Sequence, residues 1–181
     1  MVKQVEVNAV TAGSPSPLAL IAGPCVIESA GMIDETAARL KEIAARLGIG
    51  LIFKSSFDKA NRSSLSSYRG PGFEAGLKIL AGVKAKYGLP VISDIHETWQ
   101  AAPAAEVLDA LQIPAFLARQ TDLLAAAAKT GRPVNVKKGQ FMAPEDMAQT
   151  VGKMAAQEGF AGLMLSERGS SFGYHNLVVD M

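Results

Sequence analysis

The chain has a single cysteine among its 181 residues, and this scarcity excludes an internal disulfide framework. One unpaired thiol fits a reducing compartment, so we expect a cytoplasmic protein. Long hydrophobic runs are missing as well. The most apolar stretch, residues 18–27, is short and is interrupted by Gly23-Pro24, so it lacks the length of a membrane span. The N-terminal segment does not show the charge, apolar run and cleavage site of a signal peptide.

Charge of one sign is not in excess. The 18 lysines and arginines nearly balance the 17 aspartates and glutamates, which leaves a formal net charge of +1. This balance argues against broad electrostatic binding to nucleic acid or to a membrane surface. Any positive field must therefore be local. The hydrophobic content of 49% is typical of a compact globular protein and excludes a largely disordered chain.

Short apolar segments alternate with helical ones along most of the chain. The apolar segments are residues 18–27, 50–57, 90–96, 110–116, 133–139 and 162–168. The helical segments are residues 34–48, 71–88, 98–110, 121–131 and 143–159, where apolar residues recur about every 3.6 positions. This alternation predicts an α/β fold with a parallel sheet and right-handed crossovers. The first 17 residues predict a short strand and a turn before the main fold.

Most of the predicted strands begin with apolar residues and end in reactive side chains. The side chains in question are Cys25, Glu28, Lys54, Ser56, Asp94, His96, Gln112, Lys137 and Arg168. In a parallel sheet such ends lie on one edge, and in a barrel they meet at the mouth that holds the active site. No predicted strand is followed by a G-x-G-x-x-G turn, which disfavours a Rossmann fold. We therefore expect an enzyme or ligand site at the carboxyl ends of the strands.

The stretch "FKSSFDKANRSS", residues 53–64, follows an apolar strand without a linker. It carries Lys54, Lys59, Asn61, Arg62 and Ser63, which are the donor types that bind phosphate and carboxylate oxygens. Anion binding is the first hypothesis for this segment, and a solvated loop is the alternative. Lysines 137 and 138 are adjacent in another predicted strand, so their side chains point in opposite directions. Of the two, the second is expected to be an ordinary solvated charge.

Six strings in this chain resemble 3-deoxy-D-manno-octulosonate 8-phosphate synthase. They are "AGPCVIES", "FKSSFDKANRSSLSSYRGPG", "SDIHE", "LQIPAFLARQTDLL", "NVKKGQFMAPEDM" and "ERGSSFGYHNLVVDM", in the same order and spacing from about Val2 to Met181. That family condenses phosphoenolpyruvate with D-arabinose 5-phosphate and releases phosphate, in the route to the Kdo sugar of Gram-negative lipopolysaccharide. The resemblance implies a transferase.

The resemblance also implies a TIM (β/α)8 barrel. Such barrels have eight units and typically about 250 residues. Only about six units can be counted in this chain, so residues 1–181 are expected to form a single partial barrel domain, with residues 1–17 as an extension at the barrel bottom. We expect these 181 residues alone to be inactive, because the missing units would leave the sheet open.

The same resemblance implies roles for individual side chains in binding the two substrates. The expected ligands of phosphoenolpyruvate are Lys54, Ser56, Lys59, Gln112, Lys137 and Arg168. Those of arabinose 5-phosphate are Asn61, Arg62, Ser63 and Asp94, with Arg62 and Ser63 on its phosphate. The residues expected nearest the chemistry are Lys59, Asn61, Asp94 and His96. Arg119 is expected to reach the sugar phosphate in a neighbouring subunit of a homotetramer.

Cys25 has two interpretations. A lone cysteine at a strand end is usually a small buried filler. In the family, however, a cysteine here distinguishes metal-dependent from metal-independent enzymes, which carry asparagine, so the resemblance implies a divalent metal ligand of unspecified metal. The family's other ligands, a histidine, a glutamate and an aspartate, lie beyond the segment matching "NLVVDM" and are not in this sequence. His175 matches no motif position and is expected to be exposed.

Two other functions remain open at this stage. The related 3-deoxy-heptulosonate 7-phosphate synthase shares the barrel and "GPC" but uses erythrose 4-phosphate. It typically carries Lys-Pro-Arg-Thr where this chain has residues 59–63, Lys-Ala-Asn-Arg-Ser, and this difference favours the octulosonate enzyme. The second alternative is a non-catalytic phosphate-binding remnant, which would bind phosphoenolpyruvate without releasing phosphate.

Overall fold

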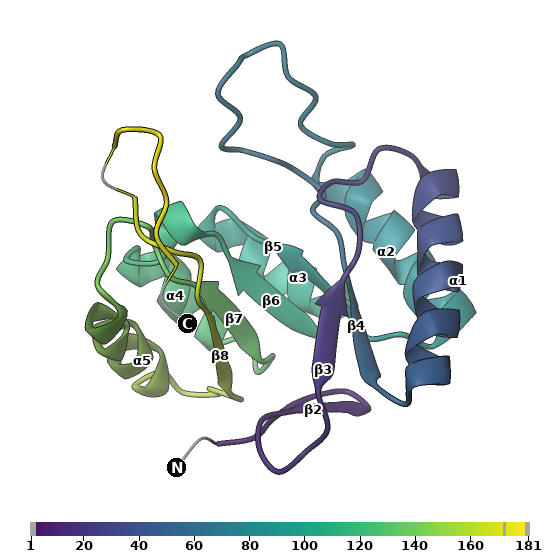
Figure 1. Cartoon of the computed structure of the whole chain (residues 1–181), viewed down its shortest axis with the longest axis horizontal. Helices are drawn as coiled ribbons and strands as arrows, with labels where there is room; N and C mark the ends of the chain where they lie inside the picture. Colours follow the sequence, from purple (N-terminus) through teal and green to yellow (C-terminus); the bar gives the residue numbers. More distant parts are fainter. Residues whose placement is uncertain (1–2, 172, 180–181) are drawn as a thin grey trace. The chain divides into compact units, whose positions relative to one another are not determined.

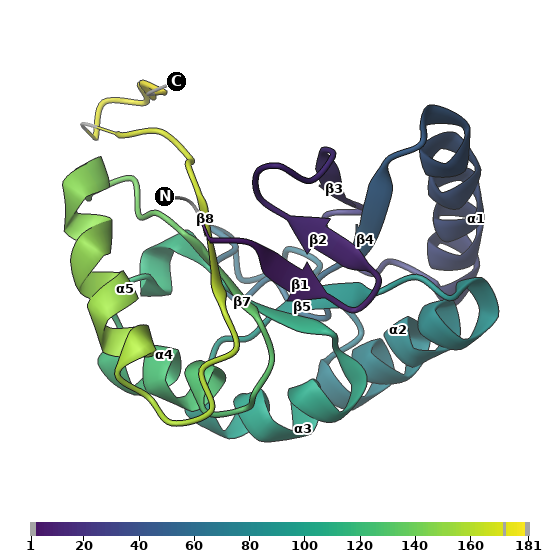
Figure 2. The ribbon, with the colours of Figure 1, turned by 90° about the horizontal axis from the view of Figure 1, so that it is seen from below.

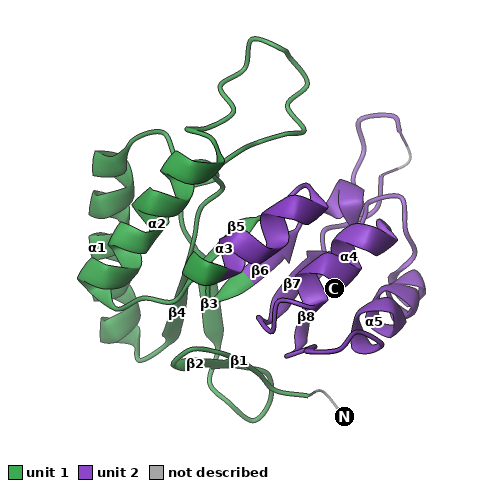
Figure 3. Cartoon of the chain, turned by 180° about the vertical axis from the view of Figure 1, so that it is seen from behind, with its two compact units in different colours: residues 1–94, 106–110 green, residues 95–105, 111–181 purple. Residues whose placement is uncertain are grey.

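A computed structural model describes residues 3–171 and 173–179 of the chain. The chain forms two compact units, drawn in two colours in Figure 3. Unit 1 contains residues 1–94 and 106–110, and unit 2 contains residues 95–105 and 111–181. Both units are built from parallel strands and helices, and each is described separately below.

Unit 1 carries the N-terminal strands and the first two long helices. Its elements are β1 (Val5–Val7), β2 (Val10–Ala12), β3 (Ala19–Ala22), α1 (Ala30–Leu47), β4 (Gly50–Lys54), α2 (Phe73–Tyr87) and β5 (Val91–Asp94). Strands β3, β4 and β5 are parallel neighbours, with Ala19 opposite Gly50 and Phe53 opposite Val91. Strands β4 and β5 are almost wholly buried, and their apolar residues give way to Lys54, Ser93 and Asp94 at the carboxyl ends.

The segment before the main fold is a two-stranded antiparallel hairpin in which Val5 pairs with Ala12. It packs against the beginnings of β3 and β4 (Figure 2). Gly50 allows this approach, because a Cβ atom at Gly50 would lie 2.8 Å from Cγ1 of Val10. The hairpin therefore lies at the opposite ends of these strands from Lys54.

The two helices of unit 1 pack beside each other, α1 against β4 and α2 against β5 (Figure 2). The sequence predicted that α1 starts at residue 34, but it begins four residues earlier. The reason is Ser29, whose hydroxyl accepts a hydrogen bond from the backbone N–H of Met32 at 3.1 Å and so caps the first turn. The helix ends at Gly48, which has the left-handed φ of 65° that glycine adopts without strain.

Unit 2 repeats the same alternation. The elements from residue 95 onward are η1 (Thr98–Gln100), α3 (Ala101–Val107), β6 (Ala110–Ile113), η2 (Ala115–Leu117), α4 (Thr121–Ala128), β7 (Val134–Lys137), η3 (Pro144–Asp146), α5 (Met147–Ala155) and β8 (Leu163–Ser166). The last two residues of α3 and the first of β6 belong to unit 1. Strands β6, β7 and β8 are parallel neighbours, with Gln112 opposite Asn135 and Lys137 opposite Ser166. Helices α4 and α5 pack together.

These elements confirm the predicted fold class. Six parallel strands, β3 to β8, alternate with helices, and in each unit strands that follow one another in the chain are neighbours in the sheet. This arrangement is that of an α/β protein of the TIM-barrel family, with six parallel strands and five connecting α-helices in the described part of the chain. Among the described residues, no helix is both long and apolar enough to cross a membrane.

Candidate active site

Three of the predicted site residues meet at the carboxyl ends of β4 and β5 in unit 1. Lys54 is the last residue of β4 and Asp94 the last of β5. The Lys54 ammonium lies 2.7 Å from Oγ of Ser56 and 3.4 Å from Oδ2 of Asp94, and the Ser56 hydroxyl donates to the same carboxylate oxygen. The side chains of Lys54 and Asp94 are only 13% and 5% exposed. We call these three residues the strand-end cluster.

The backbone around the strand-end cluster is held by the turn that follows β3. A Cβ atom at Gly23 would lie 1.9 Å from the carbonyl oxygen of Lys54, so only glycine allows this approach. Two side chains of the β4 segment then bond to the turn: Ser55 Oγ donates to the Pro24 carbonyl at 3.0 Å, and Lys54 Nζ to that of Cys25 at 3.3 Å. The "GPC" string is thus fixed on the end of β4.

Cys25 lies on this turn, three residues beyond β3, and is exposed. Partial burial opposes ionisation of its thiol, but a hydrogen bond from Lys59 and the positive charges of Lys59, Lys54 and Arg62 outweigh it and lower the pKa. The thiolate is therefore available as a nucleophile or metal ligand at a lower pH than for an isolated cysteine. The interpretation of Cys25 as a buried filler is wrong.

The loop of residues 58–70 leaves the end of β4 and rises from unit 1 (Figure 1). Its base is closed by a bidentate pair between Asp58 and Arg69 and by the Lys59 N–H, which donates to the Arg69 carbonyl at 2.7 Å. Phe57 sits under the base, 1% exposed. The Asp58–Arg69 pair was not predicted from the sequence, although opposite charges at the two ends of a serine-rich segment were a usable signal.

The tip of this loop carries Asn61, Arg62 and Ser63, which we call the loop cluster. All three are exposed. Arg62 Nε donates to the Tyr68 carbonyl at 3.3 Å, and Tyr68 Oη donates to the Ile27 carbonyl at 3.0 Å. Arg62 also lines a shallow hollow with Val26, Glu28, Ser67 and Tyr68. The structure therefore brings Lys54, Ser56 and Asp94 together and links Cys25 with Lys59, while the loop cluster stays in solvent.

In unit 2, buried and half-buried polar side chains connect the three strands. The Asn135 amide donates to Oε1 of Gln112 at 2.9 Å, and Ser166 Oγ donates to Oδ1 of Asn135 at 2.9 Å. Gln112, predicted at a strand end, lies one residue before the end of β6 and is 2% exposed. Asn135 and Ser166 were not among the predicted site residues. Asn135 could have been found, because it precedes Lys137 by two residues and so shares its face of β7.

The prediction that Lys138 is a solvated charge is wrong. Its side chain is 3% exposed, and its ammonium donates to the carbonyls of Gly139, Met142 and Gly169 at 3.3, 3.1 and 2.9 Å. Lys138 is the first residue after β7, and the loops after β7 and β8 cover its side chain. Lys137 is the last residue of β7 and is half-buried.

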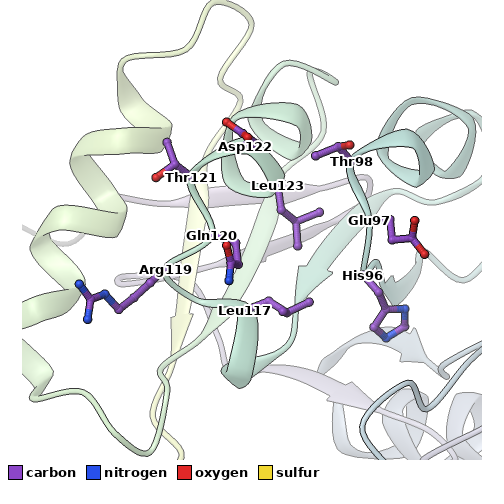
Figure 4. A pocket seen from close by; sticks show the side chains of 9 residues that line it. All are labelled: His96, Glu97, Thr98, Leu117, Arg119, Gln120, Thr121, Asp122 and Leu123. Atoms are coloured by element: carbon purple, nitrogen blue, oxygen red, sulfur yellow. The ribbon is translucent and has the colours of Figure 1, made fainter.

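The remaining predicted residues of unit 2 lie on loops. A hollow between the loop after β5 and the start of α4 is lined by His96, Glu97, Thr98, Leu117, Arg119, Gln120, Thr121, Asp122 and Leu123. Figure 4 shows His96 and Arg119 at opposite ends of it. His96 is half-buried and its backbone N–H donates to Oε1 of Gln100 at 2.7 Å, whereas Arg119 is exposed. Arg168 is exposed two residues after β8, and His175 is exposed as predicted.

Cys25 is the candidate metal ligand among the described residues. Cys25 offers one sulfur with an accessible thiolate, which suits soft and borderline divalent ions. Within residues 3–171 and 173–179, no three histidine, cysteine, aspartate or glutamate side chains gather closely enough to hold a metal ion. The described residues therefore supply a thiolate donor at Cys25 but not a complete set of metal ligands.

Parallel strands that end in Lys54, Asp94 and Lys137, followed by loops with further cations, define a barrel-type α/β protein with charged groups at its strand ends. The chain belongs to the DAHP synthetase I family, whose family model matches residues 2–181.

Individual relatives are closely similar. A protein of Fusobacterium nucleatum subsp. nucleatum is 58% identical over 180 residues, which are 99% of this chain and 64% of that protein. A protein of Trichlorobacter lovleyi is 60% identical over 181 residues, 100% of this chain and 66% of that protein. Both are named 2-dehydro-3-deoxyphosphooctonate aldolase. The chain therefore spans just under two thirds of the length of these relatives.

Proposed function

We propose that the native protein is a transferase that condenses phosphoenolpyruvate with D-arabinose 5-phosphate to 3-deoxy-D-manno-octulosonate 8-phosphate, with release of phosphate. The product would serve the synthesis of Kdo and lipopolysaccharide in the cytoplasm. The proposal is supported by relatives that are 58–60% identical and carry the name 2-dehydro-3-deoxyphosphooctonate aldolase. The single observation that carries it is the strand-end cluster, next to Lys59 and Arg62.

The charges of this region suit the two substrates. Phosphoenolpyruvate has a carboxylate and a phosphate, and the sugar has a second phosphate, so the site must neutralise several negative charges. Lys54, whose ammonium is held by Ser56 and Asp94, and Lys59, whose backbone bonds to Arg69, would supply positive charge for phosphoenolpyruvate. Arg62, with its planar fork, suits a phosphate group of the sugar. We also assign Gln112, Lys137 and Arg168 to phosphoenolpyruvate, and Asn61, Ser63 and Asp94 to the sugar.

The chemistry balances without an oxidant or reductant. Carbon 3 of phosphoenolpyruvate attacks the aldehyde carbon of arabinose 5-phosphate, and the aldehyde oxygen takes up a proton to become a hydroxyl. Water adds to the cationic carbon 2 and loses a proton. The bond between carbon 2 and the phosphate oxygen then breaks, which leaves the keto acid and inorganic phosphate. Fixed cations stabilise the negative charge that develops on the aldehyde oxygen, and His96 would bind substrate or water here.

A divalent metal at Cys25 is a further part of the proposal. When bound, the metal would supply a positive charge that polarises a carbonyl group. The lowered pKa of the Cys25 thiol supports this role, since a metal takes the thiolate. We expect Cys25→Asn to remove most of the metal, because a neutral amide replaces a thiolate. Metal content and sensitivity to a chelator, measured on native and variant protein, would both stay unchanged if Cys25 binds no metal.

The assay that tests the function measures phosphate release from phosphoenolpyruvate with two sugars. We expect turnover with arabinose 5-phosphate and little with erythrose 4-phosphate. Preference for the second sugar would identify the heptulosonate reaction instead. Binding of phosphoenolpyruvate without phosphate release from either sugar would indicate a non-catalytic protein.

We further propose a homotetramer in which Arg119 completes the site of a neighbouring subunit. Arg119 is exposed, and an arginine supplied across an interface presents a rigid fork to phosphate. Arg119→Ala should then weaken binding of arabinose 5-phosphate and leave the fold intact. Co-refolding Arg119→Ala with Arg62→Ala should restore part of the activity, since some sites receive both arginines from intact copies. Heteromers that form but regain no activity would contradict a shared site.

A further inference from the structure

Lys138 lies where the loops after β7 and β8 meet in unit 2. Its ammonium donates to the carbonyls of Gly139 and Met142 in the first loop and to that of Gly169 in the second, at 3.3, 3.1 and 2.9 Å. Its own backbone N–H donates to the Ser166 carbonyl at 2.9 Å. One side chain therefore joins two loops that are about thirty residues apart in the sequence.

Burying the Lys138 ammonium costs more free energy than burying an apolar side chain would. An ammonium removed from water is destabilising unless its N–H groups find acceptors, and an apolar side chain of similar length would avoid that cost. The nearest carboxylate oxygen, Oε1 of Glu167, is 3.8 Å away, and that residue also accepts the Gly169 N–H. Three carbonyls satisfy the three donors of Lys138. Unlike an apolar residue, the lysine fixes the positions of backbone groups, because each of its hydrogen bonds holds one carbonyl oxygen.

The fixed carbonyls flank two of the residues assigned to phosphoenolpyruvate. Lys137 directly precedes Lys138. Arg168 lies between Glu167 and Gly169, and the Lys138 ammonium pairs with the Glu167 carboxylate and donates to the Gly169 carbonyl. Gly169 is closely packed, since a Cβ atom there would lie 2.8 Å from the Val178 carbonyl oxygen. We infer that Lys138 is a positioning residue that fixes the backbone from which Lys137 and Arg168 present their charges. This inference rests on the proposed function, in which these two residues bind phosphoenolpyruvate.

The test compares Lys138→Met with two other lysine variants in the native protein. Lys137→Met removes a proposed direct ligand, and Lys129→Met removes an exposed lysine as a matched control. Two quantities are measured for each: phosphoenolpyruvate binding by calorimetry, and amide hydrogen exchange of residues 139–142 and 167–171 by mass spectrometry. The second quantity does not depend on any catalytic function.

We expect Lys138→Met to weaken phosphoenolpyruvate binding about tenfold or more, because a misplaced ligand loses most of its contribution. It should also speed amide exchange in both loops. Lys137→Met should weaken binding and leave exchange at residues 167–171 as in the native protein, and Lys129→Met should change neither quantity. Lys138→Arg should recover part of the binding, since it keeps a donor but cannot place it at the same point.

Other outcomes would overturn the inference. Unchanged exchange in Lys138→Met would mean that the lysine does not hold the loops, and unchanged binding would mean that holding them does not matter. If both Lys138 variants fail to fold, Lys138 supports the whole fold and is not a local positioning residue. If the native protein does not bind phosphoenolpyruvate, the proposed function fails, and the exchange data still decide whether Lys138 joins the loops.

Discussion

Two residues of the strand-end cluster, Lys54 and Ser56, lie only a few positions before the loop cluster in the sequence, yet the two clusters differ in burial and in bonding. Lys54, Ser56 and Asp94 bond to one another and are mostly buried. Arg62 and its neighbours are exposed on a loop whose contacts are concentrated at its base. The first cluster owes its geometry to the strands of the sheet, and the second to hydrogen bonds within and below its own loop, among them the Asp58–Arg69 pair and the bond from Arg62 to Tyr68. We therefore expect substitutions in the strand-end cluster to lower stability and substitutions in the loop cluster to change it little.

Removing Asp94 should have the largest effect. Asp94→Ala leaves the Lys54 ammonium and the Ser56 hydroxyl without their shared acceptor, so we expect a loss of about 3 kcal/mol in the free energy of unfolding. Product formation should fall about a hundredfold or more. Urea unfolding and phosphate release measure the two quantities.

The matched control is Asp109→Ala. Asp109 is also buried and paired, with Lys84 at 2.8 Å, but it bonds to Val91 at the start of β5, the end opposite Asp94. It should lower stability to a similar degree and leave the activity of the folded protein close to native. Equal losses of activity in both variants would mean that Asp94 acts only through stability.

Arg62→Ala should separate binding from stability on the loop. The loss of a bidentate phosphate partner should raise the KM for arabinose 5-phosphate about tenfold to a hundredfold. The KM for phosphoenolpyruvate and the urea midpoint should stay close to native, because Arg62 is exposed. Arg39→Ala, which removes an exposed arginine of α1, serves as the control. Equal effects on the two KM values would count against the assignment of Arg62 to the sugar phosphate.

The smallest effect concerns Cys25, whose thiol is influenced by both clusters. Lys59 bonds to the thiol, and the charges of Lys54 and Arg62 add to its effect, so its pKa is lowered despite partial burial. The metal-free protein should therefore react with iodoacetamide at a lower pH than free cysteine does, since a lowered pKa means thiolate at lower pH. Lys59→Met should move the reaction midpoint to higher pH, and Arg62→Met should move it less. Identical midpoints in all three proteins would show that neither cation acts on the thiol.

The sequence by itself determined the order of strands and helices, because apolar periodicity and glycine at helix ends depend on neighbours a few residues away. It also located Lys54, Asp94 and Lys137 at strand ends, since a strand ends where its apolar run gives way to polar residues. The start of α1 was missed by four residues because one capping hydroxyl set it.

Only the tertiary structure decided which of these side chains meet. The pairing of Lys54 with Asp94 requires two strands to be neighbours, and the burial of Lys138 requires a loop about thirty residues away to cover it. The chain of Gln112, Asn135 and Ser166 likewise depends on the register of three strands. A local pattern fixes the face on which a side chain emerges from its strand. Whether that face is buried or exposed depends on residues distant in the sequence, so burial and bonding partners could not be predicted from the pattern alone.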